Sequence, residues 1–345
     1  MTIRDSFAAS ALALALVACG GGGSSPTPTS GGGVVAAPAP APTPTPTPTP
    51  TPPPSPTYPS FSELTGEQTL DTVCGGRELV RIDNGSIFTD IERSIITPFG
   101  ADIPLVSDRD EPNYTFWSQA DGLTAFNVSF DQSDRDLNRV SSEIYRRELP
   151  GTGGLEAFLR FAPPSVNSQP LIYAQYASLR YLTDDNIFVD LRCALGVPTL
   201  LTDTPSSVIE YSASGPFEQI GAFIRAEIRE NPGLFTGGVS AAILPAVARF
   251  DPESGEITLN FTVSAQTSDT SDDVTEIATF SASAVFDGSE TNFSGVILDE
   301  PGSEVGEFNG WFFGPQGAEL AISVNIETSF ANGDELFVTG VAFLR

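Results

Sequence analysis

Residues 257–263 read Ile-Thr-Leu-Asn-Phe-Thr-Val, so every second residue is large and apolar and the residues between them are polar. Side chains of an extended strand point alternately to opposite faces, and this run therefore predicts a β-strand with one buried face. The same alternation recurs at 278–286 and at 320–326. It predicts a mainly β body in the C-terminal half of the chain.

Turn-forming residues separate these runs and indicate a meander of strands. Gly, Pro, Asn and Asp cluster at 251–255, 287–288, 314–317 and 332–334, a composition typical of turns. Further strands are expected at 171–182, 187–195, 208–212, 239–250, 292–298, 307–313 and 336–344. Closure into an antiparallel β-barrel of about eight strands would remove the exposed edges. A barrel of that size is either filled by side chains or holds one small ligand.

One segment has apolar residues at helical spacing. The residues are Phe217, Ile220, Ile224 and Ile228. Pro216 precedes them, and Asn-Pro-Gly at 231–233 provides a stop signal. We therefore expect one short helix here that packs on the barrel or caps it.

The preceding part of the body, 58–169, predicts a small and irregular β-rich subdomain. The segments 114–117 and 126–130 have the aromatic content and alternation of strands. Polar residues, Gly and Pro interrupt such segments at short intervals. We expect few long strands in this subdomain.

A cluster of carboxylates in this subdomain has to be weighed as a metal site. Asp134, Asp136 and Asn138 have the alternate spacing of a calcium loop. However, Arg139 stands where the loop glycine belongs, and Tyr145 stands where the bidentate glutamate belongs. We favour a solvated charged turn over a calcium site.

The charge balance excludes several classes of function. The chain has 44 acidic and 16 basic residues, a net charge of −28, and all the basic residues are arginine. Such a surface repels nucleic acid and anionic lipid. Without His or Lys there is no Ser-His-Asp triad, no His-bearing zinc site and no Schiff base. Hydrolysis of glycans by a pair of carboxylates remains compatible with the sequence. We nevertheless expect that the protein is not an enzyme and binds no cofactor.

The N-terminus resembles a bacterial lipoprotein precursor. Residues 1–18 have a short apolar run that is too short to span a bilayer, as in a signal peptide. Leu16-Val17-Ala18-Cys19 resembles the lipobox, which implies acylation of Cys19. Gly20 follows the cysteine, and by the lipoprotein sorting rule this implies the outer membrane. The alternative is an ordinary signal peptide with an incidental cysteine.

Residues 19–57 predict a disordered stalk. A Gly run is followed by Pro alternating with Ala or Thr from Pro38 to Pro56, which favours polyproline II. This segment would reach about 60 Å at roughly 3.1 Å per residue. It is either a spacer that lifts the body above the surface or a neutral linker.

Cys74 and Cys193 remain once Cys19 is acylated. In an oxidising compartment two remaining thiols favour a disulfide. Such a bridge would tie the first subdomain to the second. Two buried free thiols are the alternative.

Two groups of residues carry a family resemblance. The first is Gly196, Thr199, Pro205 and Tyr211, and the second is Gly295, Gly310, Gly314, Pro315 and Glu319. They resemble motifs of the transferrin-binding protein B-like surface lipoproteins. The resemblance covers about 170–345 and implies a barrel there, preceded by a handle subdomain at 58–169.

The resemblance also has limits that bear on function. Full transferrin receptors of the family have two lobes, whereas this chain has length for one, so transferrin as a ligand does not carry over. The motif glycines are expected to be turn or packing residues, and Trp311 to be core. Glu319 is expected to satisfy backbone donors in its hairpin rather than to catalyse.

These expectations combine into one functional hypothesis and one alternative. The hypothesis is a non-enzymatic surface lipoprotein of the outer membrane that binds a protein or small solute, with an outer-membrane transporter and iron or haem uptake as candidate connections. The alternative is a structural or adhesive lipoprotein without a discrete ligand. In both, the lipid anchor is the contact with the membrane.

Overall fold

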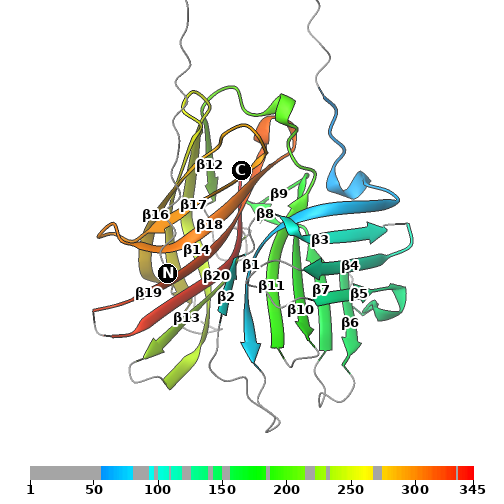
Figure 1. The fold of residues 1–345 in the computed structure, drawn as a ribbon, viewed down its shortest axis with the longest axis horizontal. Coiled ribbons are helices and arrows are strands. Elements are labelled where there is room, and N and C mark those ends of the chain that lie inside the picture. Colours follow the sequence, from blue (N-terminus) through cyan, green and yellow to red (C-terminus); the bar gives the residue numbers. More distant parts are fainter. Residues whose placement is uncertain are drawn as a thin grey trace, which may run out of the picture. The chain divides into compact units, whose positions relative to one another are not determined.

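The structure is a computed structural model of the whole chain. It describes residues 56–80, 93–96, 100–108, 110–118, 126–138, 143–149, 156–183, 187–213, 222–230, 234–266, 274–331 and 333–345. These residues lie in one compact unit that begins at Pro54. They form two nine-stranded antiparallel sheets and a two-stranded hairpin (Figure 1). The predicted signal peptide, Cys19 and nearly all of the stalk lie outside the described residues.

The first sheet is open and has the strand order β5-β4-β3-β1-β11-β10-β7-β6, with β2 also paired to β1. Figure 1 shows it in blue to green. Its strands are β1 (Glu67–Val80), β2 (Arg93–Ile96), β3 (Gly100–Asp108), β4 (Asn113–Ser118), β5 (Phe126–Phe130), β6 (Glu143–Glu148), β7 (Glu156–Ala162), β10 (Ala174–Leu182) and β11 (Ile187–Gly196).

The sequence placed the segments 171–182 and 187–195 with the barrel, whereas β10 and β11 belong to the first sheet. Each residue from Ala174 to Leu182 pairs with β11, and β11 pairs in turn with β1. Alternation alone marks a strand but not its partner, which explains the difference. The change from one sheet to the other therefore falls after Gly196.

The hairpin of β8 (Ser165–Val166) and β9 (Gln169–Pro170) lies between β7 and β10. Its two turn residues, Asn167 and Ser168, have φ of 52° and 64°. Positive φ at both central positions matches the twist of tight antiparallel hairpins. This turn returns the chain towards β10.

The second sheet forms the barrel that the sequence predicts. The order is β12-β14-β13-β20-β19-β18-β17-β16-β15, and a further pairing of β14 with β15 closes the ring. Its strands are β12 (Ile209–Ala213), β13 (Ala222–Glu230), β14 (Leu234–Asp251), β15 (Glu256–Gln266), β16 (Val274–Val285), β17 (Asn292–Leu298), β18 (Glu304–Phe313), β19 (Glu319–Ser329) and β20 (Glu335–Leu344).

Two short strands share one position of this barrel. The long strand β14 pairs with β13 through residues 234–241 and with β12 through residues 246–250. On the other side β13 pairs with β20, and Ser212 of β12 exchanges hydrogen bonds with Arg345 just after β20. The barrel is therefore antiparallel with eight strand positions, as predicted.

The predicted helix at 217–228 is wrong where the structure describes it. Residues 222–230 form strand β13, with ladder partners on both sides. Ile220, Ile224 and Ile228 are four residues apart, a spacing that a helix face and a strand face share because four is a multiple of two. The β-branched side chains of isoleucine also favour a strand. In the described residues only short 3-10 turns are helical, and none is long or apolar enough to cross a membrane.

One hydrophobic core lies within the first sheet, and a second core fills the barrel and extends to residues of the first sheet such as Val73 and Ala194. The two sheets meet where β1 passes β20. A Cβ placed on Gly75 would lie 2.4 Å from the carbonyl oxygen of Gly340. The Thr339 hydroxyl donates to the carbonyl of Gly76 at 3.1 Å. The backbones of the two strands therefore approach more closely than side chains would allow.

Candidate binding site

Most of the motif residues meet at one place, which we call the joint. It consists of residues 172–174 at the start of β10, the connection 196–205 that begins at the end of β11 and the hairpin 314–319 that joins β18 to the start of β19. Gly196, Thr199, Pro205, Gly314, Pro315 and Glu319 lie in it, and Tyr211 of β12 reaches it. These residues connect the two sheets to each other.

Thr199 fixes the connection to the hairpin. Its backbone N–H donates to the carbonyl of Phe312 at 2.9 Å, and its hydroxyl donates to the carbonyl of Gly314 at 2.7 Å. Gly314 has φ of 72°, and a Cβ there would lie 2.2 Å from the ring of Tyr173. The hydroxyl and the backbone N–H of Thr199 are thus both used to hold the hairpin. Position 314 requires glycine because a side chain there would meet the ring of Tyr173.

Tyr211 holds the far end of the same hairpin. It is buried, and its hydroxyl donates to the carbonyl of Gly317 at 2.7 Å. Burial raises the pKa of Tyr211 well above its ordinary value, so the hydroxyl keeps its proton and remains a donor. Pro205 packs against the same glycine. The tyrosine therefore acts as a clamp on the hairpin.

Glu319 is the buried charged residue of the joint. It is 1% exposed, and its carboxylate accepts three backbone N–H groups, from Ile172 at 2.7 Å, Tyr173 at 3.0 Å and Ala174 at 2.8 Å. Burial raises its pKa, while these donors and Arg345 act in the opposite direction. The expectation that Glu319 satisfies backbone donors agrees with this geometry, but the donors lie at the start of β10 and just before it rather than in its own hairpin.

Gly295 and Gly310 serve packing inside the barrel. A Cβ on Gly310 would lie 2.2 Å from the ring of Phe293, and one on Gly295 would lie 2.6 Å from the ring of Phe308. Both glycines therefore make room for aromatic rings. Neither is free to contact a ligand.

Aromatic side chains pack together at one end of the barrel interior. Phe312 is fully buried and lies within 6.0 Å, between ring centroids, of Tyr211, Phe250, Phe286 and Phe293. This packing accounts for one end of the barrel near the joint. We therefore expect no ligand site at that end.

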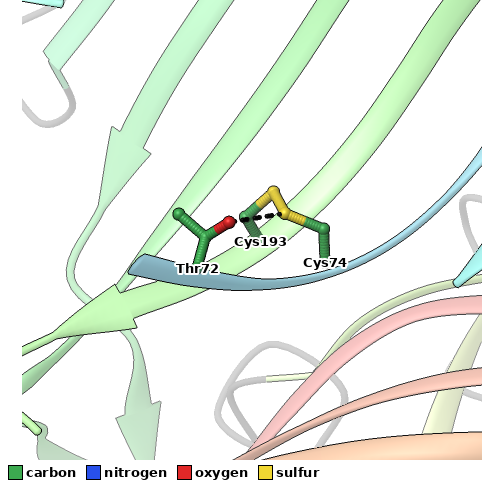
Figure 2. Close-up of a disulfide and its surroundings, with 3 residues drawn as sticks. All are labelled: Thr72, Cys74 and Cys193. Atoms are coloured by element: carbon green, nitrogen blue, oxygen red, sulfur yellow. Dashed lines mark hydrogen bonds between the residues drawn. A yellow bond between two sulfur atoms is a disulfide. The ribbon is translucent and has the colours of Figure 1, made fainter. Parts of the chain in front are cut away.

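Cys74 and Cys193 form a disulfide (Figure 2). They stand directly opposite each other on β1 and β11, and the Thr72 side chain hydrogen-bonds to the Cys74 sulfur. The bridge therefore links neighbouring strands of one sheet. The expectation that it ties two subdomains together is wrong, because β11 belongs to the first sheet.

The carboxylates of the calcium-loop pattern have other partners. Asp134 lies 3.5 Å from Arg147, and Asp136 lies 3.7 Å from Arg146. Within the described residues no group of three or more acidic or Cys side chains is arranged to hold a metal ion. The turn is held by these ion pairs.

A feature that the sequence did not predict is a cluster of arginines on one face of the first sheet. It comprises Arg77, Arg146, Arg160, Arg180 and Arg192, and we call it the arginine face. Four of them, with Phe158, Tyr176 and Phe188, line a shallow hollow of about 550 Å³. The hollow lies over β6, β7, β10 and β11, which are neighbours in Figure 1.

Asp190 organises the inner part of the arginine face. It is 2% exposed and lies 3.4 Å from Arg180, 3.7 Å from Arg192 and 4.0 Å from Arg77. One buried carboxylate thus orients three guanidinium groups. Removing the buried carboxylate of such a cluster is strongly destabilising, so Asp190 contributes to the fold.

Phe158 organises the outer part. The guanidinium carbons of Arg146 and Arg180 lie 5.5 Å and 5.6 Å from its ring centroid, within the range of cation–π attraction. Arg146 also pairs with Glu156 at 3.5 Å. The face therefore combines cations with an aromatic platform in one hollow.

The fold and this face define a class of protein: a two-sheet β-protein, one sheet open and one closed into a barrel, with a cationic hollow on the open sheet. No protein-family model matches the chain, and no curated protein matches it.

Structures of transferrin-binding protein B are among the solved structures that match the chain. A double mutant from Haemophilus parasuis, titled a vaccine antigen, is 11% identical over 81% of this chain and 78% of that chain, with a TM-score of 0.35. The isotype 1 protein from Neisseria meningitidis is 12% identical over 81% of this chain and 66% of that chain, with a TM-score of 0.32.

Proposed function

We propose that the protein is a lipid-anchored surface module that binds a ligand without turning it over. The observation that carries the proposal is the arginine face, a preformed cationic hollow on a chain of net charge −28. Guanidinium groups stay protonated and cannot serve as general acids or bases at ordinary pH. A hollow lined by arginines and aromatic rings is suited to holding a ligand.

The location follows from the N-terminal segment. We propose signal peptide cleavage after residue 18, acylation of Cys19, a stalk over 19–57 and outward display of the body on the outer membrane. Two or more acyl chains anchor a protein stably. The stalk supports access to the arginine face, because it gives the body reach from the lipid surface.

The motif residues support a binding rather than a catalytic role for the body. Thr199, Tyr211 and Glu319 each have their polar groups used in the joint. We propose that the joint holds the two parts, 58–169 with β10 and β11 on one side and the barrel on the other, as a scaffold. The ligand site then lies on the sheet rather than in the joint.

The proposal is tested by ligand capture with the full chain carrying Cys19→Ala, which removes the lipid. Immobilised protein is exposed to concentrated medium from the native environment, and the retained material is identified by mass spectrometry. We expect a specific solute or protein that an Arg160→Ala, Arg180→Ala variant does not retain. Equal retention by both proteins, or no retention by either, would contradict the proposal.

A second candidate is a structural or adhesive surface protein without a discrete ligand. The filled barrel end around Phe312 favours it. In this case the acidic surface would promote self-association bridged by calcium. Light scattering with and without calcium distinguishes the two, because only the second candidate predicts calcium-dependent growth in size.

A further inference from the structure

The arginine face is ordered in two rows by the strand register. In one row Arg146 stands opposite Phe158, which stands opposite Arg180, and Arg180 stands opposite Asp190. Residues directly opposite each other in a sheet share a face. These side chains therefore project to the same side of the sheet.

The second row repeats the pattern two residues along the strands. Arg160 stands opposite Ser178, and Ser178 stands opposite Arg192. Arginines within a row are two strands apart, about 10 Å, and the rows are about 7 Å apart along the strands. A single small acid group cannot reach all four arginines, whereas a molecule with several acid groups can.

The face has more positive than negative charge. Its five arginines meet four carboxylates, Asp190, Glu156, Asp136 and Glu148, which stands opposite Glu156, so the excess is one positive charge. Arg160 forms no ion pair within the described part of the chain, and it is exposed. The excess therefore faces the hollow and is not used by the fold.

Arg192 adds an unsatisfied donor. Its Nη1 atom is buried without a hydrogen-bond partner, 3.7 Å from Asp190. Buried donors without acceptors are rare in folded proteins because they are costly. An anionic ligand in the hollow would draw the Arg192 guanidinium towards an acceptor.

We propose that the ligand of the arginine face is a small organic polyanion carrying at least two phosphate or carboxylate groups. This inference rests on the proposed function and names its ligand class. Arginine binds both groups in bidentate geometry, and the rings of Phe158, Tyr176 and Phe188 offer an apolar surface to the carbon skeleton. The hollow has the volume of a small-molecule site.

The charge of the rest of the chain opposes large anionic partners. A net charge of −28 repels nucleic acids and anionic bilayers over distances of about a Debye length, roughly 8 to 10 Å in physiological salt. A small polyanion lies within the positive field of the face and largely escapes this repulsion. An acidic protein segment would be a ligand of a different class. The comparison with polyglutamate described below distinguishes it from a small polyanion.

The test is calorimetric titration of the full chain carrying Cys19→Ala with citrate, tripolyphosphate, acetate and monophosphate at constant ionic strength. We expect citrate or tripolyphosphate to bind at least about tenfold more tightly than acetate and monophosphate. The comparison of the two polyanions distinguishes carboxylate from phosphate ligands. Affinity should fall as salt is raised.

Two variants localise the effect. Arg160→Ala removes an exposed arginine that the fold does not use and should weaken binding of the polyanion about tenfold, while Arg160→Lys should retain part of it. Arg249→Ala makes the same charge change on β14 of the barrel, where Arg249 pairs with Asp251, and should leave affinity unchanged. Melting temperatures confirm that each variant is folded.

Several results would overturn the inference. They are equal binding of polyanions and monoanions, loss of affinity in Arg249→Ala equal to that in Arg160→Ala, or binding of polyglutamate but of neither small polyanion. If neither polyanion binds while the capture experiment still retains a ligand through Arg160 and Arg180, the ligand class is wrong and the binding function stands.

Discussion

Glu319 shows that a buried charge in this protein is part of the framework. Its two oxygens accept three N–H groups from 172–174. Glutamine has nearly the same shape but would turn an NH₂ group towards at least one of these donors. We therefore expect Glu319→Gln to lower the free energy of unfolding by about 1 to 3 kcal/mol, measured by urea denaturation.

A control for this prediction is Glu327→Gln on the same strand, since Glu327 is exposed. Its effect should stay within about 0.5 kcal/mol. If the two variants lose the same stability, the three N–H groups do not depend on the Glu319 charge.

The titration of Glu319 gives a second prediction at this scale. Because its pKa is raised in the folded state, the folded protein takes up this proton at a higher pH than the unfolded chain, which titrates near 4.5. The resulting stability is fully present below that value and is lost as the pH rises through the folded pKa. The stability advantage of wild type over Glu319→Gln should therefore grow as the pH falls between about 8 and 4. Urea unfolding across this range measures it, and a constant difference would contradict it.

The residue scale also shows what the sequence could reveal and what it could not. Resemblance identified Thr199, Tyr211 and Glu319 as special, but their partners lie 106 to 147 residues away in the chain. The arginine face was missed because Arg160, Arg180 and Arg192 have no common period. Each lies two residues after Phe158, Ser178 or Asp190 and shares a face with it, which was visible in the sequence, but only the register of four strands brings them together.

At the scale of elements, most strands were predictable and their partners were not. The predicted run 292–298 coincides with β17, and 257–263 lies within β15. Alternation fixes which residues share a face, but it leaves open which sheet a strand joins, as β10 and β11 show. The error at 217–228 came from a four-residue spacing that helices and strands share.

The contact between β1 and β20 yields a prediction for the two strands. A methyl group at position 75 would meet the backbone of Gly340. We expect Gly75→Ala to lower the free energy of unfolding by about 1 to 3 kcal/mol, the usual cost of overpacking. Thr69→Ala on the exposed side of the same strand is the control. If Gly75→Ala and Thr69→Ala had equally small effects in urea denaturation, β1 and β20 would not approach so closely in solution.

The disulfide between β1 and β11 should contribute strongly to stability. Its cysteines are separated by 119 residues, and closing a loop of about this length removes roughly 4 to 5 kcal/mol of chain entropy from the unfolded state in the entropic account. A reductant should therefore lower the urea midpoint of wild type. It should leave the Cys74→Ser, Cys193→Ser variant unchanged, and an equal response of both proteins would argue against the bridge.

At the scale of the whole molecule, charge and anchoring have to be considered together. The net charge of −28 opposes contact between the body and anionic lipid. We therefore propose that acyl chains provide any attachment to a membrane, and one chain alone gives only marginal binding. In this account, all of the membrane affinity resides at one cysteine that the body does not need for folding.

Cys19→Ala tests this separation of anchor and body. We expect the variant to leave the membrane fraction and to lose labelling by radioactive palmitate, since the net charge of −28 opposes attachment of the body to anionic lipid. Its melting temperature should equal that of wild type, because Cys19 lies outside the compact unit that begins at Pro54. Gly21→Ala is the control, since it leaves the cysteine in place. A Cys19→Ala protein that stays with the membrane, or a wild-type protein that takes up no palmitate, would show that something other than an acylated cysteine holds this chain.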